Sequence, residues 1–180
     1  MDLWNIEALF ADGSPPPAVI GPSVRARLAV LFQRHLPPSG RLLHLEVGPG
    51  AAAAVLARRF RGWQFHPVVR DGQKRAEVEV WRGLAAVENL KAPRLDATDS
   101  TSSWTARCFD AVLVGPASLR RVQAVLPVAR HVLEAGGICL VVLDADVVLT
   151  EGTLEAQWSQ VDSDESGGCA RIFVLQMCGG

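Results

Sequence analysis

The chain has 180 residues, which fits the usual size of one domain. Its 18 basic and 19 acidic residues give a formal net charge of −1, which excludes the overall basic charge typical of nucleic-acid-binding proteins. Hydrophobic residues make up 49% of the chain, yet no run approaches the roughly 18 apolar residues that cross a bilayer. We therefore expect a globular protein with no transmembrane segment and no nucleic-acid partner.

Residues 1–22 are predicted to form an N-terminal docking segment followed by a Pro-rich connector. Residues 3–10, LWNIEALF, suit a short helix with one apolar face, whereas residues 12–22 contain too much proline and glycine for regular structure. The first twenty residues include acidic residues but no Arg or Lys, unlike a secretory signal or a mitochondrial presequence. We expect an intracellular protein, cytoplasmic or mitochondrial, with no cleavable presequence.

The rest of the chain alternates between predicted strands and helices. In chain order, the first half contains a helix over 24–36, a strand over 41–47, a helix over 51–60, a strand over 63–69, a helix over 73–90 and a strand over 91–95. The second half contains a strand over 109–114, a helix over 118–133, a strand over 138–144, and a hairpin with strands over 153–161 and 170–177.

Local signals support these elements and their arrangement. Ser23 is expected to cap the first of these helices, and Gly136 and Gly137 are expected to end the helix that begins at 118. The strand over 138–144 is continuously apolar, which is typical of parallel sheets covered on both faces. The pattern predicts an α/β fold: a doubly wound, Rossmann-like, mostly parallel sheet of about seven strands, with helices on both faces and a C-terminal antiparallel hairpin.

The turn after the first strand is the best local signal for a ligand site. Residues 45–52 read LEVGPGAA, and Gly48 and Gly50 there would let the backbone approach a bound ligand closely. The alternative is structural, because any tight turn from a strand into a helix uses glycine. Glu46 either orients this turn or is a strand-end carboxylate at the surface.

Residues 36–113 resemble a family of short proteins similar to class I S-adenosylmethionine (SAM)-dependent methyltransferases. The resemblance rests on LPPSGRLLHLEVGPG, on WQFHP after the next helix, on LKAPRLDATD with Trp104 nearby, and on FDAVL, all in this order. It implies a methyltransferase-like domain over 23–180 and SAM-dependent methylation as the family's activity.

The resemblance also implies which residues would hold the cofactor. Glu46, Gly48 and Gly50 correspond to the family's glycine turn. Asp71 is the acidic candidate for the ribose hydroxyls only by its general position about 20 residues past the glycine turn, or it is a turn-forming residue before Gly72. The resemblance itself aligns Pro67 with the family's acidic position. Asp96 would accept from the adenine amino group, or it is a loop or N-cap residue.

Several departures from the family pattern affect the predicted function. The third glycine of the turn is replaced by Ala52, and residues 115–119, GPASL, offer no general base after the fourth strand. The connection over 145–151 is too short for the helix usually found there. The histidines and cysteines lack the spacing of metal ligands, so we predict no catalytic residue and no metal site.

We therefore expect a methyltransferase-fold protein that has lost catalysis, binds no cofactor and acts as a structural or accessory subunit of a larger protein assembly. Other protein subunits are its expected partners. The alternative is an active SAM-dependent methyltransferase that acts on a small molecule or a protein. A third hypothesis is a regulatory module that binds SAM without catalysis.

Overall fold

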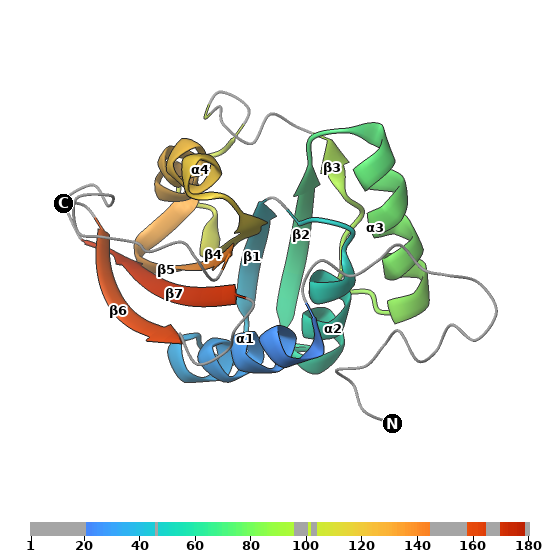
Figure 1. Cartoon of the computed structure of the whole chain (residues 1–180), viewed down its shortest axis with the longest axis horizontal. Helices are drawn as coiled ribbons and strands as arrows, with labels where there is room; N and C mark the ends of the chain where they lie inside the picture. Colours follow the sequence, from blue (N-terminus) through green and yellow to red (C-terminus); the bar gives the residue numbers. More distant parts are fainter. Residues whose placement is uncertain are drawn as a thin grey trace.

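The computed structural model describes residues 21–45, 47–95, 101, 104–144, 158–164 and 170–178. In chain order its elements are α1 (Pro22–His35), β1 (Gly40–Leu45), α2 (Ala51–Arg59), β2 (Trp63–Val69), α3 (Gly72–Ala85), β3 (Arg94–Leu95), β4 (Phe109–Ala117), α4 (Leu119–Val132), β5 (Leu133–Asp144), β6 (Trp158–Asp164) and β7 (Ala170–Met177). The alternating order predicted from the sequence is confirmed, and Figure 1 shows how the elements are arranged.

All seven strands form one sheet, in the order β3-β2-β1-β4-β5-β7-β6. β1 to β5 pair in parallel, whereas β7 runs antiparallel to both β5 and β6. The predicted fold class, a mostly parallel doubly wound sheet with a C-terminal antiparallel hairpin, is therefore confirmed. Strand order reverses at β1, whose neighbours are β2 and β4, and ligands of doubly wound sheets bind beside the carboxyl ends of the strands at such a point.

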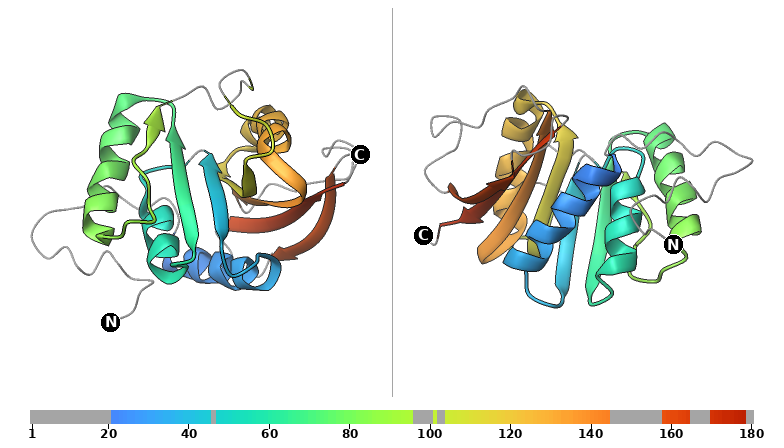
Figure 2. Two further views of the ribbon diagram at one scale, coloured as in Figure 1. Left: turned by 180° about the vertical axis from the view of Figure 1, so that it is seen from behind. Right: turned by 60° about the horizontal axis from the view of Figure 1, so that its bottom comes forward.

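Helices cover both faces of the sheet, as predicted. α1, α2 and α3 lie in a row over one face, and α4 lies over the other, against β4 and β5 (Figure 2). Successive strand residues point to opposite faces, so Leu42 packs under α1 and α2 while Leu43 packs in the layer of α4. Two apolar layers thus fix the sheet between the helices.

The start of the first helix differs from the prediction. Ser23 does not cap it: Gly21 occupies the N-cap position without a side-chain bond, and Pro22 is the first helical residue. Proline suits this position because its fixed φ matches the helix and its missing N–H would have no partner there. Within the described residues, no helix has the length and apolar content needed to cross a membrane.

α3 ends earlier than the predicted helix over 73–90. It stops at Ala85, and Ala86 adopts a left-handed conformation with φ of 49°. Asn89, expected inside the helix, instead donates from its side-chain amide to three backbone carbonyls around the end of α2 and the start of β2, those of Ala57, Phe60 and Trp63. These bonds hold the chain in a non-helical path after Ala86.

Gly136 and Gly137 do not end α4. The helix ends at Val132 and β5 begins at once, so both glycines lie within the strand. Gly136 has φ of +76°, and a Cβ on Gly137 would lie 2.8 Å from the carbonyl oxygen of Glu134. The pairing of β5 with β4 is irregular here, so the glycines allow a bend in the strand instead of capping a helix.

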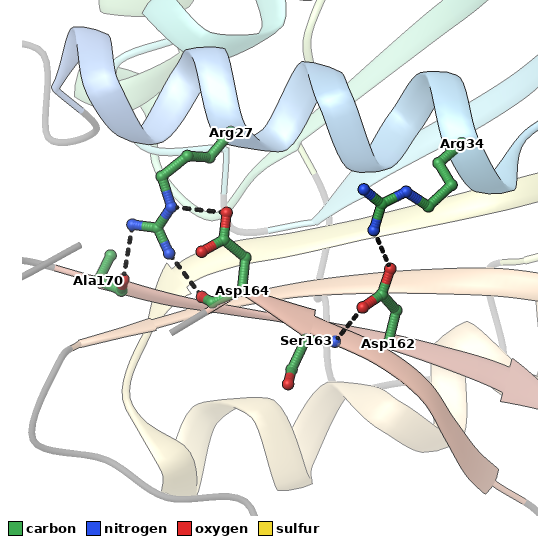
Figure 3. A network of polar contacts seen from close by, with 6 residues as sticks. All are labelled: Arg27, Arg34, Asp162, Ser163, Asp164 and Ala170. Carbon is green, nitrogen blue, oxygen red and sulfur yellow. Dashed lines mark hydrogen bonds and ion pairs between the residues drawn. The ribbon is translucent and has the colours of Figure 1, made fainter. Parts of the chain in front are cut away.

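Polar contacts tie α1 to the C-terminal hairpin (Figure 3). The Arg27 guanidinium pairs with the Asp164 carboxylate at 2.9 Å and donates to the Ala170 carbonyl at 3.2 Å. Two turns further along α1, Arg34 pairs with Asp162 at 2.8 Å. We call these contacts the α1–hairpin network. It connects the first described helix to the last two strands.

Candidate functional site

The turn between β1 and α2 lies at the carboxyl edge of the sheet, where the sequence predicted a ligand site. Gly48 has φ of 62° and Gly50 has φ of 102°, both in the left-handed region that favours glycine. A Cβ on Gly50 would lie 3.0 Å from the Cα of Val78 in α3. Gly50 is therefore required by its backbone and by the close packing of α3 against the start of α2.

A cavity of about 210 Å³ opens beside this turn. Its described lining comes from the carboxyl ends of β1, β2 and β4 and from the start of α3, and consists of Val47, Gly48, Val68, Val69, Arg70, Asp71, Lys74 and Pro116. The fold thus brings Gly48 and Asp71 to one cavity, although they are far apart in the sequence. Glu46 and Asp96 lie outside the described residues.

Asp71 has a structural role at this cavity. It is the N-cap of α3, and its Oδ1 accepts a hydrogen bond from the backbone N–H of Lys74 at 2.8 Å. Such a bond satisfies one of the free N–H groups at the start of a helix. Asp71 is therefore a helix cap, and the binding of ribose hydroxyls by its carboxylate stays a prediction.

Two basic residues at the rim were missed from the sequence. Arg70 directly precedes Asp71, and Lys74 lies three residues after it in the first turn of α3. The Lys74 ammonium group pairs with Glu77 at 2.7 Å. The spacing of Lys74 from Asp71 is the signal that would have placed Lys74 here, because residues i and i+3 share one side of a helix.

The wall formed by β4 provides no ionisable group. Pro116 is the β4 residue in the described lining, and it has no N–H to donate. Behind it, the buried His44 donates from Nε2 to the Gly115 carbonyl at 3.2 Å. Burial lowers the pKa of His44 to about 4, so this imidazole is neutral at pH 7. His44 holds the wall in place without facing the cavity as a charge.

The described residues do not fit a bound SAM molecule well. The cavity is smaller than the about 300 Å³ at which pockets for drug-sized ligands begin. Asp71 is the only carboxylate in the described lining, and one of its oxygens is already bonded to α3.

The described part of the structure has a second cavity, which lies away from the predicted cofactor residues. A larger cavity of about 470 Å³ lies at the opposite edge of the sheet, between the ends of α1 and α2, and contains none of the predicted site residues. Its lining is mostly apolar and includes Phe32 and Phe60. No group of three or more His, Cys, Asp or Glu residues that could hold a metal ion occurs among the described residues.

The fold is similar to that of several solved structures. TrmN from Thermus thermophilus is 16% identical with a TM-score of 0.71; the match covers 97% of this chain and 52% of TrmN. A candidate methylase, HI0767 from Haemophilus influenzae, is 13% identical with a TM-score of 0.63; the match covers 87% of this chain and 98% of HI0767. A fibrillarin/Nop5p complex contains a chain that is 14% identical with a TM-score of 0.65; the match covers 92% of this chain and 88% of that chain.

These similarities show a class I SAM-dependent methyltransferase-like fold, as the sequence resemblance implied. This chain spans about half the length of TrmN. No protein-family model matches the sequence, and no curated protein matches it.

Proposed function

We propose that this chain is a methyltransferase-fold protein without methyl-transfer activity, which acts as a structural or accessory subunit of a larger protein assembly. One observation carries the proposal: candidate cofactor residues at the carboxyl edge have structural tasks. Gly50 packs against Val78 in α3, and Asp71 caps the same helix. Pro116 and three valines form half of the described lining, and the wall formed by β4 provides no ionisable group.

Composition supports a role in an assembly. Hydrophobic residues make up 49% of the chain, and an apolar composition favours surfaces that a partner covers. The fibrillarin/Nop5p structure provides one case of a similar fold within a complex. In this proposal residues 1–22 are the docking segment, residues 23–180 are the methyltransferase-like domain, and the assembly is cytoplasmic or mitochondrial.

The mass of the native protein tests this role. After gentle extraction from its natural source, the chain should elute from a sizing column well above the mass of its monomer, together with defined protein subunits. High salt should release it as a monomer if polar contacts hold it. Elution as a monomer in the first extract, at low salt, would contradict the accessory role.

A second candidate function is SAM-dependent methylation of a small molecule or a protein. It is favoured by the cavity that remains beside the β1–α2 turn, where Gly48 and Asp71 lie together. This candidate requires Asp96 to hold the adenine. It predicts micromolar binding of S-adenosylhomocysteine, which Asp96→Ala should abolish.

A further inference from the structure

The face of the sheet opposite α1–α3 has no described helix over β1, β2 and β3. α4 packs on β4 and β5, away from β2 and β3 in both views of Figures 1 and 2. The sequence of β2, WQFHPVV, alternates in its first half: Trp63 and Phe65 are buried under the helices, whereas Gln64 is exposed and His66 half-buried on the other face. Parallel sheets are normally covered on both faces, so this polar strand face is unusual.

Basic side chains surround these polar residues. Arg41 of β1 is paired in register with Gln64, and the next same-face pair is Leu43 with His66. Lys91 follows the end of the loop from α3, and its backbone N–H bonds to the Phe65 carbonyl at 2.9 Å. We call Arg41, Gln64, His66 and Lys91 the basic sheet face.

Arg41 and Lys91 place two positive charges beside His66. The pKa of His66 is lowered first by burial and then by the charges of Lys91 and Arg41, so both cations act on one imidazole. The Asp110 carboxylate is a negative charge at the edge of this surface, where it accepts the backbone N–H of Arg41 at 2.7 Å. Within the described residues, the Lys91 ammonium group donates to a backbone carbonyl, that of Glu88.

Beside the basic sheet face, Arg94 of β3 packs against the nearly buried Trp104. The guanidinium of Arg94 lies 4.4 Å from the centre of the Trp104 ring, and the Trp104 carbonyl accepts from His131 at 3.0 Å. Trp104 is only 8% exposed. Its ring is therefore not available to stack on nucleic-acid bases, which single-stranded nucleic-acid sites generally require.

We propose that the basic sheet face docks an acidic segment of a partner protein. The inference rests on the accessory role proposed above and identifies the chemistry of one contact. Arg41 and Lys91 provide the opposite charge, and Gln64 provides amide groups for the backbone or carboxylates of the segment. Charge complementarity of this kind sets the choice of partner and the rate of association.

Binding of an acidic peptide to the full-length chain tests the proposal. The probe is a fluorescein-labelled dodecapeptide of alternating glutamate and alanine, followed by fluorescence anisotropy at low salt. The double variant Arg41→Glu/Lys91→Glu should weaken binding by about tenfold or more, because two attractions become repulsions. The milder variant Arg41→Gln/Lys91→Gln should give a smaller loss in the same direction, and it guards against misfolding of the first.

The matched control is Arg58→Glu/Arg61→Glu, which makes the same change of charge near the end of α2. It should change the affinity by less than about twofold if the site is local. Equal weakening in both double variants, or no binding by the wild-type chain, would overturn the proposal. Tighter binding of a labelled uridine dodecanucleotide, lost in the Arg41→Glu/Lys91→Glu variant, would assign the face to nucleic acid and overturn it as well.

The sizing experiment separates this inference from the proposed function. A native monomer that still binds the peptide through Arg41 and Lys91 would contradict the accessory role alone. A native complex whose chain does not bind the peptide would contradict the docking proposal alone.

Discussion

Gly50 is constrained by two features that involve no ligand. Its φ of +102° lies in the left-handed region, and a Cβ there would meet the Val78 backbone at 3.0 Å. A left-handed conformation costs an ordinary residue about 1–2 kcal/mol, and moving a packed helix adds to this. The residue type expected of a cofactor turn is thus also the type that the helix packing requires.

Gly50→Ala should therefore lower the free energy of unfolding by at least about 2 kcal/mol. Gly83→Ala is the matched control, since Gly83 lies inside α3 and a Cβ there meets nothing within 4 Å. That substitution should raise stability by about 0.5–1 kcal/mol, because alanine favours the helix more than glycine does. Urea unfolding followed by circular dichroism measures both values, and equal effects would contradict the packing argument.

Asp71 offers a second test at this scale. Asp71→Ala removes the cap of α3 and should lower the free energy of unfolding by about 1 kcal/mol. Asp71→Asn keeps an acceptor oxygen of similar capping strength and should stay within a few tenths of a kcal/mol of the wild type. The same unfolding assay checks this, and a large loss in the Asn variant would show that the charge matters more than the cap.

The lowered pKa of His44 should make the free energy of unfolding depend on pH. Its folded pKa of about 4 lies below the ordinary 6.5, so between these values the unfolded chain binds more protons than the folded one. The free energy of unfolding should fall as the pH drops from 6.5 towards 4, by up to about 3 kcal/mol from this residue. His66, whose pKa is also lowered, adds a fall in the same direction.

Unfolding in urea at a series of pH values measures this slope. In the His44→Gln variant the fall between pH 6.5 and 4 should be smaller, with the remainder due to His66 and the carboxylates. A slope identical to that of the wild type would contradict the assignment. The lowered pKa of Asp162 acts in a separate window, since its contribution is lost only as the pH falls below about 3.8.

At the level of elements, the α1–hairpin network joins segments more than a hundred residues apart. Of the two arginines in this network, Arg27 is the more buried: its side chain is 15% exposed, whereas that of Arg34 is 59% exposed. Buried hydrogen bonds to charged groups contribute more than exposed ion pairs do. The two arginines therefore form a matched pair for mutation.

Arg27→Ala should lower the free energy of unfolding by about 1–3 kcal/mol and speed hydrogen exchange in β6 and β7, because it removes the ion pair with Asp164 and the hydrogen bond to the Ala170 carbonyl. Arg34→Ala should cost less than about 1 kcal/mol and leave exchange in the hairpin nearly unchanged. Equal effects of the two substitutions would show that α1 is held by its apolar face alone.

Periodicity predicted the elements themselves, but contacts between distant segments determined several of their ends. The apolar run after α4 and the alternation of the last two strands predicted β5 and the hairpin, but β5 begins at Leu133 instead of 138, and β6 continues to Asp164, past the predicted end at 161. The predicted end of α3 was wrong because Asn89 bonds to carbonyls around the α2–β2 connection, which no local pattern reveals. Gly136 and Gly137 were read as a helix end because bends within strands use the same residue.

The candidate site was predictable only in part. The sequence placed Gly48 and Asp71 at one edge of the sheet, since the carboxyl ends of parallel strands meet there, and the cavity brings them together. It could not decide between a ligand and a structural role, because the contact of Gly50 with Val78 depends on how α2 and α3 pack. The roles of Glu46 and Asp96, which lie outside the described residues, stay predictions.

At the scale of the whole molecule, the fold and the activity are separate questions. The similarity to TrmN and to HI0767 lies below 20% identity, and a shared fold does not determine the chemistry at its edge. The cavity at the carboxyl edge of this chain is small, and Asp71 and Lys74 in its described lining bond to the protein itself. An accessory role uses the sheet as a rigid body that presents surfaces to partners.

Calorimetric titration of the full-length chain with S-adenosylhomocysteine is the direct test of the proposed loss of cofactor binding. If that loss is real, no binding tighter than about 1 mM is expected, since a cavity of this size and lining would recover too little free energy. Micromolar binding that is lost in the Asp96→Ala variant would contradict it and favour an active methyltransferase.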